Sequence, residues 1–130
     1  MIITTNVSKQ FGKLKALDDV SVTCNKGECI ALIGPNGSGK TTLAKTILGM
    51  VVPDSGFITF NGTNILHNWN YRKDIGYMPQ IGRYPENMTI GQVLDMMRDI
   101  RHTKDAQTDE ELIETFGLTT LMHKRMRTLS

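Results

Sequence analysis

Short apolar or alternating runs, separated by turn residues, predict that the first part of the chain is mostly β-strand. The run at residues 20–24 alternates between apolar and polar positions, whereas residues 29–33 are apolar throughout, as in a strand buried on both faces. Turns are predicted at residues 53–56, Pro-Asp-Ser-Gly, and at Asn61-Gly62, a typical hairpin pair. The predicted strands span residues 2–7, 20–24, 29–33, 57–60 and 75–78.

Elsewhere the apolar residues recur at helical spacing. The first such stretch is followed by Gly49, a helix stop signal. Thr89 and Gln92 form a capping box, with Thr89 as N-cap, and residues 108–111 offer a second one, whose helix is predicted to stop at Gly117. The apolar positions are Leu43, Ala44, Ile47 and Leu48, then Ile90, Val93, Leu94 and Met97, then Leu112, Ile113 and Phe116.

Composition limits the possible classes of protein. The chain has 130 residues, of which 39% are hydrophobic, so it is long enough for a packed core. Its net charge of +2 argues against a strongly basic surface, so we expect no direct nucleic-acid partner. The apolar runs are too short to span a bilayer, and the first residues lack a signal-peptide pattern, so we expect a soluble chain. Cys24 and Cys29 are predicted to be reduced, small apolar core residues.

The clearest chemical signal is the segment Gly-Pro-Asn-Gly-Ser-Gly-Lys-Thr-Thr that begins at Gly34. It fits the phosphate-binding P-loop pattern G-x-x-x-x-G-K-T, between a predicted strand and a predicted helix, as the motif requires. Gly34, Gly37 and Gly39 let the backbone adopt positive φ and approach an anion, so that the loop N–H groups form a nest for phosphates. Lys40 is expected to reach the β- and γ-phosphates, and the Thr41 hydroxyl to hold Mg²⁺. The predicted nucleotide-binding set is Gly34, Asn36, Gly37, Ser38, Gly39, Lys40, Thr41 and Thr42.

With these motifs in this order, the whole chain resembles the nucleotide-binding domain of ATP-binding-cassette (ABC) ATPases. Residues 75–80, Ile-Gly-Tyr-Met-Pro-Gln, match the segment that ends in the family's Q-loop glutamine. The resemblance implies an α/β fold, a P-loop NTPase (RecA-like) core with an antiparallel β-subdomain and the start of a helical subdomain. It places the nucleotide-binding core and β-subdomain in residues 1–85 and a partial helical subdomain in residues 86–130.

The resemblance also implies roles for residues outside the P-loop. Phe11, within Ser-Lys-Gln-Phe-Gly, would stack on the adenine, and Ala16 would make a small apolar contact with the base. Gln80 would coordinate Mg²⁺ or the attacking water. Lys40 and Gln80 are therefore the expected catalytic residues, and Thr41 and Gln80 the expected metal ligands. The alternatives are core packing for Phe11 and a solvated loop position for Gln80.

The implied function is that of the ATP-binding subunit of an ABC transporter, which couples binding and hydrolysis of ATP, with Mg²⁺, to transport through a partner permease. The implied partners are a transmembrane permease subunit and a second ATPase domain in a head-to-tail dimer, on the cytoplasmic face of the cell membrane. Leu129-Ser130 matches the start of the family's Leu-Ser-Gly-Gly-Gln signature, so we expect the sequence to be cut inside that motif. The 130 residues alone are expected to bind ATP but to hydrolyse it negligibly. Residues 75–89 also resemble the ATPases of copper-site maturation systems for nitrous oxide reductase.

Other classes of P-loop protein are alternatives. A soluble ABC ATPase acting in translation or DNA repair would share these motifs, although repair members usually carry a coiled-coil insertion and this sequence has no heptads. A GTPase needs a base-reading Asn-Lys-x-Asp motif, which is absent, and the arginines are too loosely arranged for the lid of a small kinase. A module that senses ATP without turning it over is the non-enzymatic alternative.

Overall fold

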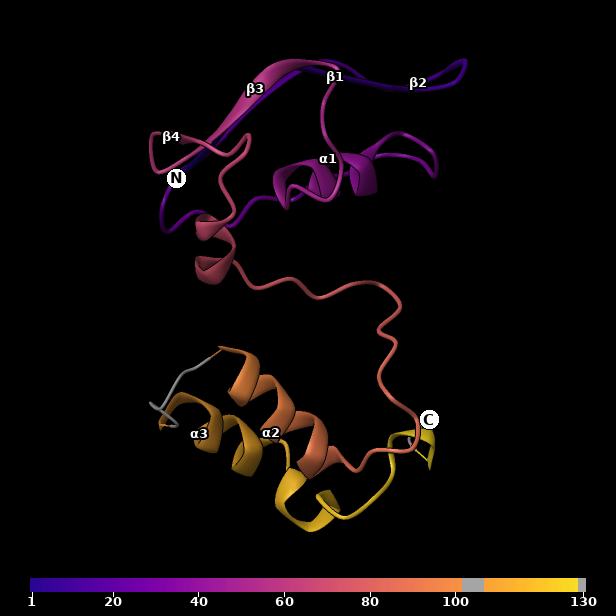
Figure 1. The fold of residues 1–130 in the computed structure, drawn as a ribbon, viewed down its shortest axis with the longest axis vertical. Coiled ribbons are helices and arrows are strands. Elements are labelled where there is room, and N and C mark those ends of the chain that lie inside the picture. Colours follow the sequence, from indigo (N-terminus) through magenta and orange to yellow (C-terminus); the bar gives the residue numbers. More distant parts are fainter. Residues whose placement is uncertain (102–106, 129–130) are drawn as a thin grey trace. The chain divides into compact units, whose positions relative to one another are not determined.

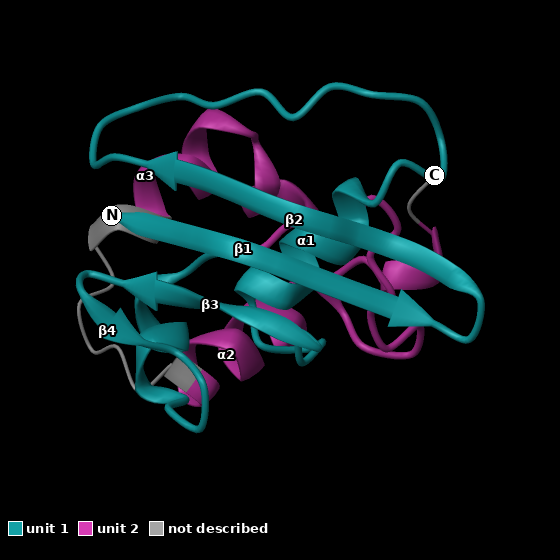
Figure 2. Ribbon diagram, turned by 90° about the horizontal axis from the view of Figure 1, so that it is seen from above, with its two compact units in different colours: residues 1–76 teal, residues 77–130 magenta. Residues whose placement is uncertain are grey.

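The computed structural model describes residues 1–101 and 107–128, and Leu129 and Ser130, the predicted start of the signature motif, lie outside the described residues. The chain forms two compact units, Met1–Gly76 and Tyr77–Ser130 (Figure 2). The units are defined by their internal contacts and not by function. The boundary between functional subdomains that the sequence predicts at residue 85 therefore stays a prediction. Within the described ranges no helix is both long and apolar enough to cross a membrane.

A four-stranded antiparallel sheet lies along one side of the first unit (Figure 1). Its strands are β1 (Ile2–Phe11), β2 (Leu14–Cys24), β3 (Ser55–Phe60) and β4 (Thr63–Asn64), in the order β2-β1-β3-β4. They confirm the strands predicted at 2–7, 20–24 and 57–60, and β1 and β2 run further than predicted, into a hairpin where Phe11 pairs with Leu14. Asn61 and Gly62 both have positive φ, 49° and 82°, as a tight hairpin turn between β3 and β4 requires.

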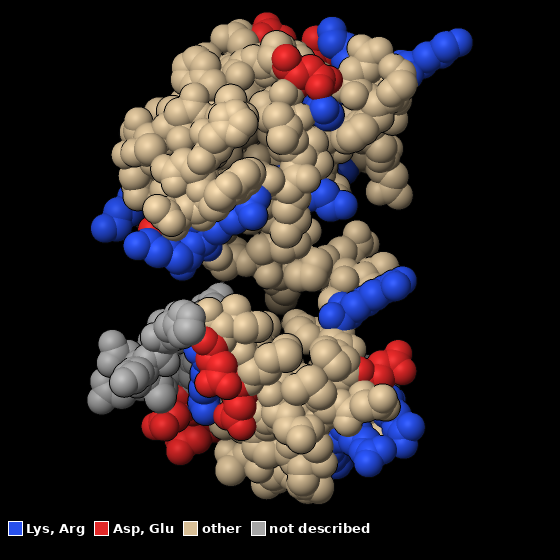
Figure 3. Space-filling model, viewed as in Figure 1, with Lys and Arg blue, Asp and Glu red and all other residues tan. Residues whose placement is uncertain are grey.

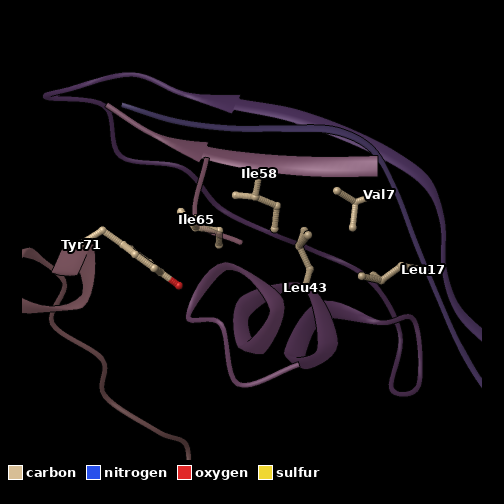
Figure 4. Packing of buried hydrophobic residues seen from close by; sticks show 6 residues of the cluster. All are labelled: Val7, Leu17, Leu43, Ile58, Ile65 and Tyr71. Atoms are coloured by element: carbon tan, nitrogen blue, oxygen red, sulfur yellow. The ribbon is translucent and has the colours of Figure 1, made fainter. Parts of the chain in front are cut away.

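The helix α1 (Lys40–Ile47) packs its apolar face against this sheet. Leu43 points from α1 toward β1 and β3, where Val7 and Ile58 project from the strands (Figure 4). Each fully buried aliphatic side chain of this kind contributes about 1.5–3 kcal/mol. Packing against the sheet therefore determines the position of the helix that follows the P-loop. The buried cluster consists of Val7, Leu17, Leu43, Ile58, Ile65 and Tyr71.

A short 3₁₀ helix, η1 (Asn70–Asp74), holds the C-terminal end of α1. The Tyr71 hydroxyl donates a hydrogen bond to the Ile47 carbonyl at 2.9 Å, and Arg72 Nη2 donates to the Gly49 carbonyl at 2.7 Å. Gly49 has a φ of 65°, which confirms the predicted helix stop. Carbonyls at a helix C-terminus have no partner within the helix, so these side chains satisfy groups that would otherwise need water.

Two predicted strands are not formed. Residues 29–33, named the pre-loop segment from here on, and residues 75–78 have no regular secondary structure. Ile33 is 90% exposed, so the prediction of a strand buried on both faces before the P-loop is wrong. Met78 is 91% exposed, and the strand predicted at residues 75–78 is also wrong. A parallel strand buried on both faces needs a neighbour on each side, and the described strands pair only within the antiparallel sheet.

Both cysteines carry free thiols, as predicted. Cys24, at the end of β2, is half-buried, but Cys29 is exposed. The prediction of a core position is therefore wrong for Cys29, because it lies in the pre-loop segment and no strand of the described sheet covers that segment.

The second unit contains the helices α2 (Ile90–Arg101) and α3 (Gln107–Thr115) and the 3₁₀ turns η2 (Leu118–Leu121) and η3 (Met126–Thr128). The capping box at the start of α2 is confirmed, because Thr89 N donates to Gln92 Oε1 at 2.9 Å and Gln92 N donates to Thr89 Oγ1 at 3.2 Å. On the predicted apolar face of α2, Ile90 and Val93 are buried.

The start and the end of α3 compare differently with the prediction. The helix begins at Gln107, so Thr108 lies inside its first turn and is not the residue that precedes it. Helix ends fray and are hard to place from sequence, which accounts for a shift of this size. Gly117, with a φ of 61°, follows the helix and confirms the predicted stop.

Candidate nucleotide-binding site

The P-loop leads directly into α1, and its glycines differ in conformation. Gly37 and Gly39 have φ values of 82° and 87°, as predicted. Gly34 is not among the residues with positive φ, so that part of the prediction is wrong. A Cβ at Gly34 would lie 2.9 Å from Ser38 Oγ, so a larger residue there would require the exposed Ser38 side chain to rotate.

Lys40 reaches back across the loop. Its Nζ donates hydrogen bonds to the carbonyl oxygens of Gly34 and Pro35, each at 2.7 Å, and to Ser38 Oγ at 3.3 Å. The ammonium group is thereby held inside the curve of the loop. A phosphate oxygen would be a stronger acceptor than these uncharged oxygens, because the bond would then join opposite charges. The Lys40 ammonium is therefore positioned to contact an anion that binds in the loop.

The helix N-terminus adds to this positive site. Gly39 is the N-cap of α1 and makes no side-chain cap, and the first turn contains no acidic residue. Thr41 lies in that first turn and is exposed, and Thr42 is half-buried. The free N–H groups and the dipole of a helix N-terminus favour negative charge. Asn36 and Ser38 are exposed on the loop itself.

The loop rests on β2. A Cβ at Gly39 would lie 2.2 Å from the Ala16 carbonyl oxygen and 3.2 Å from Leu17 Cδ2, so only glycine fits there. The structure thus places the Ala16 carbonyl beside the P-loop, and the predicted contact of Ala16 with the base stays a prediction. Leu17 pairs with Lys9 on β1, and Phe11 follows two residues further along that strand. A strand rises about 3.3 Å per residue, so Phe11 lies roughly 7 Å along β1 from this contact.

Phe11 is not a core residue. Its side chain is 48% exposed, and the Lys9 ammonium nitrogen lies 5.5 Å from the centroid of its ring. The alternative of core packing is therefore inconsistent with the structure. An exposed aromatic ring near a phosphate-binding loop is available for stacking, and its contact with a base stays a prediction.

Gln80 is exposed and belongs to the second unit, whereas the P-loop belongs to the first. Contacts within either unit do not fix its distance from Lys40, so its catalytic and metal-binding roles stay predictions. Within residues 1–101 and 107–128, no group of three or more His, Cys, Asp or Glu side chains is arranged to hold a metal ion. The metal-binding role of the Thr41 hydroxyl likewise stays a prediction.

Sequence reasoning missed the network around Asp54. Its carboxylate accepts hydrogen bonds from Lys9 Nζ at 2.6 Å and from Gln10 N at 2.7 Å. The side-chain bond from Lys9, followed by the backbone bond from Gln10, lowers the pKa of Asp54 below its ordinary value of 3.8. The sequence shows Asp54 only as a turn residue, and a lysine on a distant strand gives no local signal of the pairing.

Charge on the surface is mixed. Figure 3 shows both basic and acidic side chains on the visible face of each unit. Described ion pairs join Lys9 with Asp54, Lys15 with Asp18, and Arg98 with Asp95. An exposed pair such as Lys15 with Asp18 typically contributes less than about 1 kcal/mol. The absence of a direct nucleic-acid partner stays a prediction.

Comparison with known proteins identifies the family to which a chain with this P-loop belongs. A family model described as ABC transporter matches residues 17–130. The chain is 38% identical over 117 residues to the sulfate/thiosulfate import ATP-binding protein CysA of a Synechocystis strain, a match that covers 90% of this chain and 33% of that protein. It is 32% identical over 126 residues to the lipopolysaccharide export system ATP-binding protein LptB of Haemophilus influenzae, covering 91% of this chain and 52% of that protein. The chain thus spans about a third to a half of the length of these relatives.

Solved structures show the same fold. An ATP-binding subunit of an ABC transporter superposes with a TM-score of 0.88 at 26% identity, covering 99% of this chain and 55% of that one. A nucleotide-free ATP-binding cassette superposes with a TM-score of 0.77 at 28% identity, covering 99% of this chain and 58% of that one. The α/β P-loop NTPase fold predicted from the sequence is confirmed. The chain belongs to the ABC transporter family, within its ATP-binding component.

Proposed function

We propose that this chain is part of the ATP-binding subunit of an ABC transporter, and that its P-loop binds ATP together with Mg²⁺. The observation that carries the proposal is the arrangement of Lys40, whose ammonium is held in the curve of the loop by three oxygen acceptors. Lys40 is the first residue of α1, and the first turn of this helix contains no acidic residue. Both features attract the terminal phosphates of a nucleotide.

The residues of the first unit have distinct roles in this proposal. Lys40 exchanges its carbonyl contacts for the β- and γ-phosphates, and the loop N–H groups donate to the same phosphates. The Thr41 hydroxyl is a ligand for Mg²⁺, which when bound neutralises phosphate charge. Phe11 and Ala16 contact the adenine. Together these contacts orient the nucleotide, which is the protein's principal task in phosphoryl transfer.

The finer features of the proposal concern partners. The names of the relatives include one for import and one for export, so they favour transport as the function and set no direction for it. We infer a transmembrane permease as the partner, a second ATPase domain in a head-to-tail dimer, and a location on the cytoplasmic face of the membrane. In that assembly Gln80 contacts Mg²⁺ or the attacking water. Membership of the nitrous oxide reductase maturation group stays a prediction.

Replacing Lys40 tests the nucleotide site. Hydrogen bonds to charged groups contribute about 1.5–3 kcal/mol each, so Lys40→Ala should weaken ATP binding about tenfold or more. Isothermal titration calorimetry with MgATP measures this directly. The matched control is Lys45→Ala, because Lys45 is an exposed lysine in the last turn of the same helix. Equal affinity of wild type and Lys40→Ala would refute the role assigned to Lys40.

Hydrolysis is expected to need more than these 130 residues. The P-loop, Thr41 and Gln80 supply positioning and partial charge neutralisation, which are only part of phosphoryl-transfer catalysis. Phosphate release by the pure chain should therefore be negligible. ATP turnover that disappears in Lys40→Ala would contradict this expectation, because it would show that the described site is sufficient for catalysis.

A further inference from the structure

Asp54 connects the turn before β3 to successive residues of β1. Its backbone N–H donates to the Ser8 carbonyl at 2.9 Å. Its carboxylate accepts from Lys9 Nζ through Oδ1, at 2.6 Å, and from the Gln10 backbone N–H through Oδ2, at 2.7 Å. The three residues that it holds come directly before Phe11. Asp54 therefore fixes the end of β1 at the point where the aromatic ring projects.

Lys9 links this carboxylate to the ring. Its side chain is only 18% exposed, and its ammonium nitrogen lies 2.6 Å from Asp54 Oδ1 and over the Phe11 ring, 5.5 Å from the ring centroid. A cation in this position is attracted by the negative face of an aromatic ring. One face of Phe11 is thus covered by Lys9, and the 48% exposure of the residue leaves the rest of the ring open to solvent.

The same lysine lies beside the P-loop contact. Lys9 pairs with Leu17 on β2, and Leu17 lies under Gly39 at the N-cap of α1. Lys9 is therefore the strand partner of a residue that packs near the N-cap of α1, and the Phe11 ring that it contacts lies on the strand next to that packing.

We propose that Lys9, anchored by Asp54, is a positioning residue that holds Phe11 so that a purine base stacks on the ring face opposite the ammonium group. This inference rests on the proposed function, because it requires that ATP binds in the P-loop. The ammonium draws electron density toward its own side of the ring. The opposite face becomes less negative, which favours stacking with the electron-rich purine. Lys9 thereby increases affinity for a nucleotide over a bare polyphosphate.

The test compares ATP with inorganic tripolyphosphate, which lacks the base. Titration calorimetry of the full chain, with Mg²⁺ present, gives the affinity of each ligand for wild type, Lys9→Met and Lys9→Arg. Lys9→Met should weaken ATP binding about threefold, the size of a cation–aromatic contact, and should leave tripolyphosphate binding unchanged. Lys9→Arg retains the cation and should retain the preference. Lys26→Met is the control, because Lys26 is exposed in the turn at the other end of β2.

A purely structural role for Lys9 would lower both affinities together, and that result, or no change in either, overturns the proposal. If Lys9→Met does not fold, Asp54→Asn carries the test, since it keeps the lysine and weakens its anchor, and the same selective loss for ATP is expected. Wild type that binds neither ligand refutes the proposed function as well. Wild type that binds both, with a Phe11→Ala variant that binds ATP equally well, overturns the stacking inference and the adenine contact proposed for Phe11, and leaves the proposed binding of ATP by the P-loop standing.

Discussion

The glycines of the P-loop allow steric and conformational costs to be separated by mutation. Gly37 and Gly39 have nearly the same φ, 82° and 87°, so alanine at either position is forced into the left-handed region. Around Gly37 a new Cβ would meet nothing within 4 Å, whereas at Gly39 it would lie 2.2 Å from the Ala16 carbonyl oxygen. We expect Gly39→Ala to destabilise the first unit much more than Gly37→Ala does.

The magnitude follows from these two terms. The left-handed conformation costs about 1–2 kcal/mol for a residue with a Cβ, and this is the whole expected effect of Gly37→Ala. At Gly39 the contact is more than 1 Å shorter than the ordinary range of 3.4–4 Å, and the atom in the way belongs to the backbone of β2. Relief requires α1 to move away from the sheet, a type of overpacking that costs about 1–3 kcal/mol more. Gly39→Ala should therefore cost about 2–5 kcal/mol.

Urea unfolding at low protein concentration, followed by the fluorescence of Trp69, measures both effects. Trp69 is the single tryptophan of the chain, and Arg72 lies 4.5 Å from its ring, so its emission should change when the first unit unfolds. With slopes of about 1–3 kcal/mol per molar urea, the two midpoints should differ by roughly 1 M. Equal midpoints for the two variants would refute the close packing of Gly39 on the Ala16 carbonyl.

Other expectations follow from features of both units. Tyr71→Phe removes the hydrogen bond to the Ile47 carbonyl and should lower the free energy of unfolding in urea by about 0.5–1.5 kcal/mol. An unchanged midpoint would show that this hydrogen bond does not stabilise the C-terminal end of α1. Thr89→Ala removes the N-cap of α2 and should cost about 1 kcal/mol with a loss of helical circular dichroism; an unaltered spectrum and stability would argue against the capping box. The folded chain holds the pKa of Asp54 below 3.8, so the stability that this carboxylate contributes is complete above that pH and is lost as the pH falls through the folded-state value. The difference in melting temperature between wild type and Asp54→Asn should therefore shrink below about pH 4, and a difference that grows there would contradict the assignment. Ile33→Ser should reduce any association between copies of the chain measured by analytical ultracentrifugation, because Ile33 is an apolar side chain that is 90% exposed. Identical association of the variant and the wild type would show that this side chain does not contribute to the contact between copies.

Features that depend on neighbouring residues in the sequence were predictable. The capping box at Thr89, the hairpin turn at Asn61-Gly62 and the stops at Gly49 and Gly117 each follow from the local chemistry of a few residues. The P-loop also belongs to this class, because its glycines and its lysine are close together in the chain. For these elements the structure confirms the predicted local conformation, apart from that of Gly34, whereas the nucleotide contacts of the P-loop stay a prediction.

Features that depend on distant partners were not predictable in the same way. The pre-loop segment has the composition of a buried strand, but a strand forms only where another strand supplies hydrogen bonds, and composition does not show whether that partner is present. Asp54 and Lys9 meet because β1 and β3 pair, which no local pattern indicates. Family resemblance gave Ala16 a contact with the base, which stays a prediction, and it gave no sign that Gly39 packs closely on the Ala16 carbonyl.

The sheet order also determines when the nucleotide site can form during synthesis. β1 and β2 are neighbours in sequence and can pair as soon as both have left the ribosome, but β1 also pairs with β3, which begins only at Ser55. The buried face of α1 needs Ile58 of that strand as well as Val7 of the first. Closing so long a loop is a slow, non-local step. The P-loop and its contact with β2 are therefore synthesised before β3, and the apolar face of α1 cannot be fully covered until Ile58 is available.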